Sequence, residues 1–321
     1  MKVAIVGLGM AVTPHAKSLL DLNVEVAYAY SPSAARRAQF AQRFPFKQCD
    51  NLDAILEDRL VGAALVLTPP NTHLEIVERC AAAGKHVLLE KPLEVSTAKA
   101  ERLVQACKNV VLGVVLQHRF RPPAEKLREK LPELGKLVSA SAAIPNWRPQ
   151  SYYDQPGRGT RARDGGGVLL TQGIHTLDLF LSYTGEAAEV KSFVTTTPVH
   201  RMETEDLVAA AVRFKSGALG TVHATTAAYP GFPERIELIG TRGTALLQGT
   251  SLEMKFSDGT SYETKTESGG GGTGADPMAF PHDWHRSLLA DFLDAIEKKR
   301  APRISGAEAL KVHRFIDSLL R

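Results

Sequence analysis

Two basic side chains stand where they could handle the proton of a small substrate. The first is Lys91, in a run that predicts a helix end at Gly84, a short buried strand over Val87–Leu89, and then Glu90 and Lys91 at its carboxyl end. Ligands of open parallel sheets bind beyond the carboxyl ends of the strands. Proline at the next position ends the strand and makes the Lys91–Pro92 bond a candidate cis peptide. The alternative is a strand-ending turn with a surface lysine.

The second basic side chain is His175, on a helix predicted over Val168–Leu181. Apolar residues recur at helical spacing and predict a core stripe. The residues immediately after those of the apolar stripe form a polar stripe with the same spacing: Thr171, His175, Asp178 and Ser182. A polar ridge on an otherwise apolar helix needs partners, which a ligand cleft would supply. The alternative is a packed histidine satisfied by Asp178 within the helix.

A glycine turn near the N-terminus predicts a dinucleotide site. The strand Lys2–Val6 is followed by Gly7 and Gly9 and then by a helical pattern. Gly7 permits the tight turn, Gly9 lets a pyrophosphate approach the backbone, and the helix N-terminus supplies N–H donors. Met10 and Ala11 complete the expected contacts of this turn. Val12 replaces the third glycine of the fingerprint, and a plain strand–helix turn is the alternative.

The next strand bears on the choice between NAD and NADP. It is predicted over Val24–Tyr30, and Ser31 stands where an acidic residue would bind the ribose 2′-hydroxyl of NAD. A hydroxyl with Arg36 and Arg37 nearby favours a 2′-phosphate, and therefore NADP over NAD. The alternative is that both arginines lie on a solvated helix face.

A further strand, predicted over Ala63–Leu67, ends in a proline-rich segment that stays extended as it leaves the sheet. This shape is able to lie along the nicotinamide side of a dinucleotide. The expected cofactor contacts at these two strand ends are Thr68, Pro69, Asn71, His73, Glu90 and Lys91.

The order of elements predicts two domains. Strands alternate with helices as far as His118–Phe120, where an Arg-Pro-Pro segment marks a linker. From Lys136 onward, consecutive strands lack intervening helices. We therefore expect an α/β chain with an N-terminal Rossmann doubly wound parallel sheet over residues 1–120, and a C-terminal α+β domain with a large, mostly antiparallel sheet over residues 121–321. A flexible loop is predicted over Glu267–Asp276, and two closing helices should pack on the first half or the junction.

Composition narrows the class of protein. The chain has 321 residues, 44% hydrophobic and 23% charged, with a formal net charge of +4. These are globular values that give no reason to propose a nucleic-acid partner or a membrane span. The strand begins within two residues of Met1, which leaves no room for a signal peptide, and the three cysteines are scattered. We expect a cytoplasmic protein with no metal site.

The sequence resembles the Gfo/Idh/MocA oxidoreductases over nearly its whole length. The segments TPPNTH and AAAGKHVLLEKPL follow an N-terminal GLG…H, in which His15 matches a family histidine and Val12 departs from the usual glycine. The resemblance implies that Lys91 lies beside the nicotinamide and the reacting carbon. The GGG…GIHxxD pattern also matches, and implies that His175 meets the substrate hydroxyl. Many members carry an aspartate at the position of Thr171, so an inositol-type substrate is disfavoured.

A loop that precedes the predicted helix of His175 carries two arginines and two tyrosines. The arginines could clamp an anion, and the tyrosines could stack on a ring. Similar segments occur in family members related to sugar-nucleotide and uronate dehydrogenases, and the alternative is a loop whose aromatics pack on the sheet. The expected substrate contacts are Arg119, Arg148, Tyr152, Tyr153, Arg158 and Thr171.

The predicted function is hydride transfer between NAD or NADP and a hydroxyl or keto carbon of a sugar, cyclic polyol or sugar derivative. His175 is the expected base, Lys91 polarises the oxygen, and Asp178 orients the imidazole. Two alternatives are a dinucleotide-binding regulator without catalysis and a reductase of a small carbonyl compound. The resemblance further implies a homodimer or homotetramer.

Overall fold

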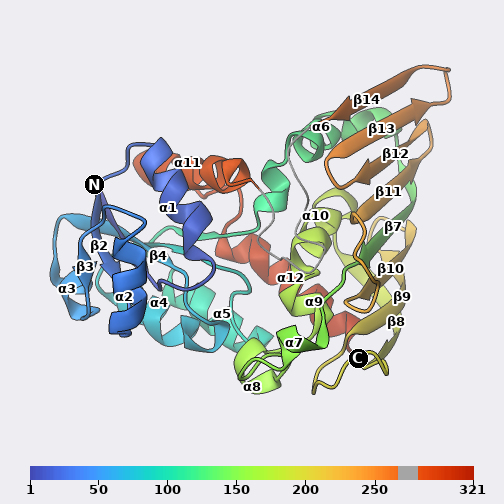
Figure 1. The fold of residues 1–321 in the computed structure, drawn as a ribbon. Coiled ribbons are helices and arrows are strands. Elements are labelled where there is room, and N and C mark those ends of the chain that lie inside the picture. The colour runs from blue at the N-terminus through green and yellow to red at the C-terminus, as the bar shows by residue number, and fades with distance from the viewer. Residues whose placement is uncertain (267–280) are drawn as a thin grey trace. The chain divides into compact units, whose positions relative to one another are not determined.

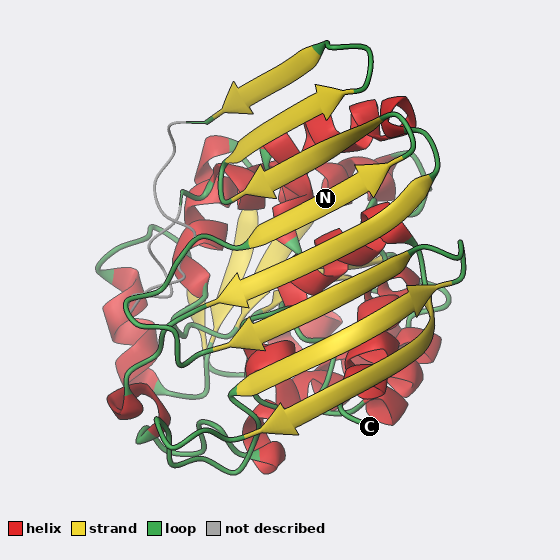
Figure 2. Cartoon of the chain, turned by 90° about the vertical axis from the view of Figure 1, so that its right-hand side faces the viewer, coloured by secondary structure: helices red, strands yellow, loops and turns green. Residues whose placement is uncertain are grey.

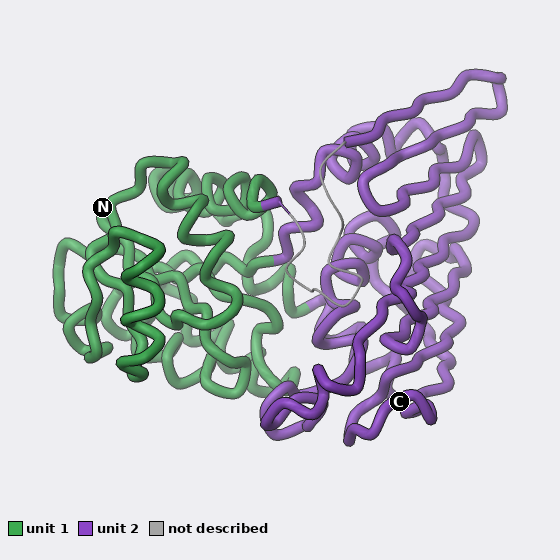
Figure 3. Tube along the Cα trace, viewed as in Figure 1, with its two compact units in different colours: residues 1–115, 282–310 green, residues 116–281, 311–321 purple. Residues whose placement is uncertain are grey.

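The computed structural model describes residues 1–266 and 281–321. The predicted loop over Glu267–Asp276 lies outside these residues. The chain forms two compact units, coloured separately in Figure 3: the first comprises residues 1–115 and 282–310, and the second residues 116–281 and 311–321. The first unit is thus built from two separated parts of the chain, and its division from the second falls within the last helix.

The first unit is built on a parallel sheet in the order β3-β2-β1-β4-β5-β6. This confirms the predicted doubly wound α/β fold, because the order reverses at β1, as in dinucleotide-binding sheets. Residues 3–6 of the central strand are fully buried, as expected for a parallel sheet covered on both faces. Its strands are β1 (Lys2–Val6), β2 (Val26–Tyr30), β3 (Gln48–Cys49), β4 (Val61–Val66), β5 (His86–Leu89) and β6 (Leu112–Val114).

Helices connect these strands, and Figure 1 shows them around the sheet. They are α1 (Val12–Asp21), α2 (Ala34–Ala41), α3 (Asp53–Glu57), the 3₁₀ turn η1 (Pro70–Thr72), α4 (His73–Ala82) and α5 (Thr97–Ala106), with α11 (Asp283–Glu297) returning from the C-terminal part. Helix α11 packs against α1 and β5. A Cβ at Gly113 would meet the Phe292 ring at 2.9 Å, so the absence of a side chain there lets α11 lie close to β6.

The second unit contains an eight-stranded sheet in the order β14-β13-β12-β11-β7-β10-β9-β8, seen face-on in Figure 2. Neighbours are antiparallel except for β7 and β10. This confirms the predicted, mostly antiparallel sheet. Its strands are β7 (Leu137–Pro145), β8 (Ala187–Thr195), β9 (Leu207–Phe214), β10 (Leu219–Thr225), β11 (Arg235–Gly240), β12 (Gly243–Gln248), β13 (Ser251–Phe256) and β14 (Ser261–Lys265).

The helices of this unit depart from the sequence prediction at two points. The Arg-Pro-Pro segment is not a linker but the start of a helix, since proline is favoured in the first helical turn, where its missing N–H costs nothing. The helix predicted over Val168–Leu181 is two helices, because the Gly173 N–H donates to the Val168 carbonyl at 2.7 Å and closes the first of them. The helical elements are η2 (Gln117–Phe120), α6 (Pro122–Lys130), η3 (Leu131–Leu134), α7 (Gln150–Tyr153), α8 (Arg161–Asp164), α9 (Val168–Thr171), α10 (Ile174–Thr184) and, shared with the first unit, α12 (Gly306–Leu319). Within the described ranges, none of the helices has the length and apolar character that crossing a bilayer requires.

Candidate active site

The glycine turn after β1 has the form that a pyrophosphate needs. Gly7 has φ +106°, and a Cβ there would lie 2.8 Å from the Leu67 carbonyl carbon. A Cβ at Gly9 would meet none of the described atoms within 4 Å, so the backbone is open on that side. Helix α1 begins with Ala11 as a cap that offers no side-chain hydrogen bond, and its first turn carries no acidic residue. The turn therefore leaves a positive helix end for an anion, and these residues fit a dinucleotide.

The residues expected at the ribose lie at the end of β2. Ser31 is buried, and its carbonyl accepts a hydrogen bond from Nη1 of Arg37 at 2.7 Å. Arg37 also lies 3.8 Å from Asp50, whereas Arg36 is exposed in the first turn of α2. Arg37 therefore supports the backbone of this strand end, and Arg36 is the arginine exposed beside it.

The end of β4 is tied to the end of β5 by His73. Its ring is fully buried, with Nε2 2.8 Å from the Thr68 carbonyl oxygen and Nδ1 3.0 Å from that of Pro92. Burial lowers the pKa of this imidazole. Thr72 adds a hydrogen bond to the Thr68 hydroxyl at 2.9 Å, and Asn71 is exposed. The cofactor role expected for His73 stays a prediction, and the ring demonstrably fixes the two strand ends to each other.

Glu90 and Lys91 follow β5, and the Lys91–Pro92 bond is cis, which confirms the sequence expectation. The Glu90 carboxylate is held on both oxygens: Oε1 accepts from Nε2 of His15 at 2.8 Å, and Oε2 accepts from the backbone N–H of Lys91 at 3.1 Å. Burial alone would raise the pKa of Glu90, but the hydrogen bond from His15 and the nearby positive charge of Lys91 hold it below its usual value.

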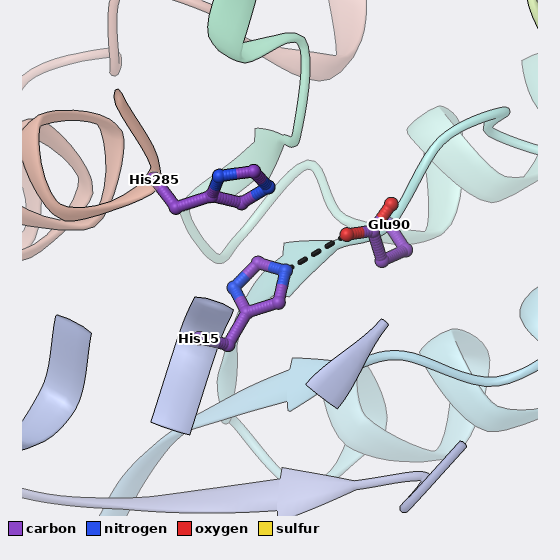
Figure 4. A group of neighbouring side chains, drawn as sticks. All are labelled: His15, Glu90 and His285. Atoms are coloured by element: carbon purple, nitrogen blue, oxygen red, sulfur yellow. Dashed lines mark hydrogen bonds and ion pairs between the residues drawn. The ribbon is translucent and has the colours of Figure 1, made fainter. Parts of the chain in front are cut away.

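A third residue, His285 of α11, completes this cluster (Figure 4). Its ring meets that of His15 edge-on, with centroids 5.1 Å apart. The ligand atoms of the three side chains lie within 4.8 Å of one another, so the group could also hold a metal ion. The sequence analysis missed His285, because nothing in the local pattern of α11 links it to a strand end nearly two hundred residues earlier.

In the second unit, His175 is half-buried near the start of α10 and stacks on the ring of His118 in η2. The ring centroids are 4.8 Å apart and the planes make an angle of 28°. Nη2 of Arg121 makes a short hydrogen bond to Nε2 of His118, and Nη1 of the same side chain lies 3.6 Å from Glu234. Burial lowers the pKa of Arg121. His118 and Arg121 were not among the predicted site residues.

Asp178, expected to orient His175, lies one turn along α10 and is bound by Arg119. Nε of Arg119 donates to Oδ2 at 2.7 Å and Nη2 to Oδ1 at 2.5 Å, in a buried bidentate pair. The structure thus joins two predicted site residues that the sequence analysis had assigned to separate tasks. The substrate contact of Arg119 and the orienting role of Asp178 stay predictions.

The predicted substrate loop precedes and includes α7. The ring of Tyr152 has the guanidinium carbon of Arg158 at 4.9 Å and that of Arg148 at 5.8 Å from its centroid. Tyr153 is buried, its hydroxyl donates to Thr226 at 2.8 Å, and burial raises its pKa. Of the two tyrosines, Tyr152 therefore lies with the arginines and Tyr153 packs inside the unit.

Thr171 ends α9. Its hydroxyl donates to the Gly167 carbonyl at 2.6 Å and contacts Gln172 at short range. The hydroxyl is thus engaged locally, and the substrate contact expected of it stays a prediction.

A nucleotide-binding parallel sheet and a second unit built on a large sheet define a class of two-unit oxidoreductases. The sequence profile described as "Oxidoreductase family, NAD-binding Rossmann fold" matches residues 1–118, and the profile of the GFO/IDH/MocA C-terminal domain matches residues 127–246. The chain belongs to the Gfo/Idh/MocA family, as its sequence motifs predicted. It is a dehydrogenase that uses a nicotinamide dinucleotide.

Relatives of known activity cover most of the chain. Myo-inositol 2-dehydrogenase of Thermotoga maritima is 30% identical over 258 residues, which cover 76% of this chain and 74% of that protein. The 1,5-anhydro-D-fructose reductase of Ensifer adhaerens is 28% identical, with 89% and 85% covered.

Among solved structures, levoglucosan dehydrogenase in complex with NADH and levoglucosan aligns with a TM-score of 0.86 and 22% identity, covering 100% of this chain and 96% of that one. The WlbA dehydrogenase from Bordetella pertussis, in complex with NADH and UDP-GlcNAcA, aligns with a TM-score of 0.83 and 24% identity, covering 100% and 95%. These structures share the fold of this chain.

Proposed function

We propose that this protein transfers hydride between NAD(P) and a hydroxyl-bearing carbon of a sugar, cyclic polyol or sugar derivative. The observation that carries the proposal lies within the first unit. Parallel strands β1, β4 and β5 end at one edge of the sheet, and the hydrogen bond from His15 of α1 to Glu90 ties the helix of the glycine turn to the segment that bears Lys91. An ammonium group at this edge is where a substrate next to a bound dinucleotide would meet it.

The two basic side chains divide the chemistry between them. Oxidation removes the hydroxyl proton, which we assign to His175, and the hydride of the same carbon, for which the nicotinamide supplies the acceptor. Lys91 holds the oxygen and polarises it as the carbonyl forms. An imidazole titrates close enough to neutrality to take a proton and return it, so the same residues serve reduction. The similarity to a 1,5-anhydro-D-fructose reductase supports the reductive direction as the second form of this function.

The substrate we propose is an anionic sugar derivative, such as a uronate or a sugar nucleotide. Arg148 and Arg158 gather around Tyr152, so cations and an aromatic face meet in one loop. Thr171 stands where many family members carry an aspartate, which disfavours an inositol. Because an inositol dehydrogenase of Thermotoga maritima is related to this chain, inositol is the first neutral compound to assay beside the anionic sugar derivatives.

Three further features belong to the proposal. NADP is the preferred cofactor, supported by Ser31 in place of an acid and by exposed Arg36 beside it. A reducing, cytoplasmic location is supported by three cysteines that are all free thiols. A homodimer or homotetramer through the sheet of the second unit is supported by Phe193, Leu219 and Ile239, which are 87%, 51% and 38% exposed.

The experiment is a steady-state assay of sugars, polyols, uronates and sugar nucleotides with NAD and with NADP. For the substrate found, Lys91→Met and His175→Ala should each lower kcat by about 10²-fold or more while dinucleotide binding is retained, since general acid–base groups contribute on that order. Lys99→Met, on the exposed face of α5, is the matched control. Activity near wild type in either site variant removes that residue from the mechanism. Tight dinucleotide binding without turnover of any compound in the panel favours a regulator instead.

A further inference from the structure

In the first unit, side chains from three elements that are distant in sequence form a cluster around one carboxylate. His15 comes from α1, Glu90 from the end of β5 and His285 from α11. His15 is 1% and His285 3% exposed, so both rings are withdrawn from solvent beside a charged group. Figure 4 shows the two imidazoles on the same side of Glu90, with a hydrogen bond joining His15 to the carboxylate. Burying an ionisable group lowers the stability of the fold unless the group is paired. The cluster is therefore expected to have a structural or functional role.

Glu90 links this cluster to Lys91. One carboxylate oxygen accepts the N–H of His15 and the other accepts the backbone N–H of Lys91, so the carboxylate spans from the helix of the glycine turn to the lysine backbone. A carboxylate can only accept, which means that Nε2 of His15 carries the hydrogen of this bond. The orientation of the His15 ring is in turn limited by the edge of His285, 5.1 Å away between centroids.

We propose that His15 and His285 are positioning residues that hold the Glu90 carboxylate, and that Glu90 in turn fixes the backbone of Lys91 and supplies the counter-charge for its ammonium group. This inference rests on the proposed function in that Lys91 is the group being positioned. It gives a role to α11, which comes from the C-terminal part of the chain but belongs to the first unit. It also explains why a charged carboxylate is kept beside two buried rings rather than replaced by an apolar side chain.

The charges around the cluster agree with this arrangement. Burial, reinforced by the proximity of His15, lowers the pKa of His285 to about 3, so this ring is neutral at pH values near 7. His282, at the start of α11, acts in the same direction and is itself paired with Asp21 at 2.8 Å. Without the His15 side chain, the effect of burial on the pKa of Glu90 would be opposed only by the weaker charge interactions with His285 and Lys91 among the causes named here, and the carboxylate would take up a proton more readily.

The test compares His15→Phe, which keeps a ring but loses the donor, with His15→Gln, whose amide can still donate to Glu90. In the Phe variant we expect kcat to fall about tenfold or more with KM little changed, and the acid limb of the kcat profile to move to higher pH. The Gln variant should recover most of kcat and the wild-type profile. His285→Leu should show a smaller loss in the same direction. His313→Phe, which removes another buried histidine outside this cluster, controls for a general loss of packing.

A second readout does not depend on turnover. The rate at which the Lys91 amine is modified by a lysine-selective reagent, followed by mass spectrometry as a function of pH, should rise about threefold or more in His15→Phe, because the ammonium has lost part of its counter-charge. Exposed Lys99 in the same sample should be unchanged. If no compound is turned over but this labelling difference appears, the proposed function fails and the positioning inference stands. Equal labelling in wild type, Phe and Gln variants overturns the inference.

Metal binding is the competing use of the same three side chains. Zinc or another divalent ion should leave the thermal midpoint of the wild type unchanged, and treatment with a chelator should leave its activity unchanged. A midpoint raised by zinc in the wild type but not in His285→Leu would overturn the positioning inference in favour of a metal site, since a two-histidine, one-carboxylate set is a known zinc ligand set.

Discussion

Arg119 binds both carboxylate oxygens of Asp178, with Nε–Oδ2 and Nη2–Oδ1 distances of 2.7 and 2.5 Å. Both side chains are buried, at 6% and 1% exposure. The pair joins η2 to α10, the helix that carries His175. It thereby fixes the helix on which the proposed base stands, through a planar fork whose geometry a lysine does not reproduce.

Arg119→Met should therefore destabilise the second unit strongly. Removing one partner of a buried ion pair costs about 3–5 kcal/mol, because the buried carboxylate loses its bidentate donor. The double variant Arg119→Met/Asp178→Leu should recover much of this loss, because no charge then remains buried. Urea unfolding followed by circular dichroism measures both free energies. A single variant as stable as the wild type would show that water reaches Asp178 and compensates it.

His118 should support His175 mainly through ring stacking. With centroids 4.8 Å apart, the stack is worth on the order of 0.5–1.5 kcal/mol, so His118→Ala should lower kcat about three- to tenfold as His175 loses its neighbour. His118→Phe keeps a ring and should retain more activity, although both variants remove the His118 nitrogen to which Arg121 is hydrogen-bonded. Steady-state kcat values for the two variants decide the matter. Equal losses would assign the effect to Arg121 rather than to the stack.

The part of the site that the sequence predicted is the part encoded by local rules. Gly7 has a positive φ, which glycine adopts without strain. An apolar run predicts the short strand β5, and the low cost of the cis form in X–Pro peptides makes the bond before Pro92 a candidate cis bond. Each of these signals lies within a few residues of the feature it predicts. The alternation of strands and helices likewise predicted the parallel sheet.

What the sequence did not predict depends on partners far along the chain. Arg119 meets Asp178 across 59 positions, and His285 reaches His15 from the other end of the protein. The pairing of His175 with Asp178 within the helix stays a prediction, and the bidentate bond that a guanidinium on another element makes to the same carboxylate is the part that no local pattern could show.

Arg36 should determine the preference for NADP. Its exposed guanidinium at the start of α2 is expected to meet the 2′-phosphate, and a hydrogen bond to a charged group is worth about 1.5–3 kcal/mol. Arg36→Ala should lower kcat/KM for NADP by about tenfold or more and leave NAD nearly unchanged. Arg37→Ala is the matched control: it removes the donor to the Ser31 carbonyl and should affect both cofactors alike. A uniform loss in Arg36→Ala would place that arginine outside the ribose site.

The buried histidine His313 should make the stability of the protein fall in acid. Burial lowers the pKa of this imidazole to about 4, whereas in the unfolded chain it lies near 6.5. Between these values the unfolded state binds a proton that the folded state does not, so the free energy of unfolding decreases as pH falls, by about 1.4 kcal/mol per pH unit at most. Over this window the loss amounts to about 3 kcal/mol. His313→Phe should remove one proton from the uptake on unfolding and flatten the slope between pH 6.5 and 4, while the contribution of His285 remains. Urea unfolding at several pH values across the window measures both slopes, and parallel curves for wild type and variant would mean that His313 is protonated equally in both states.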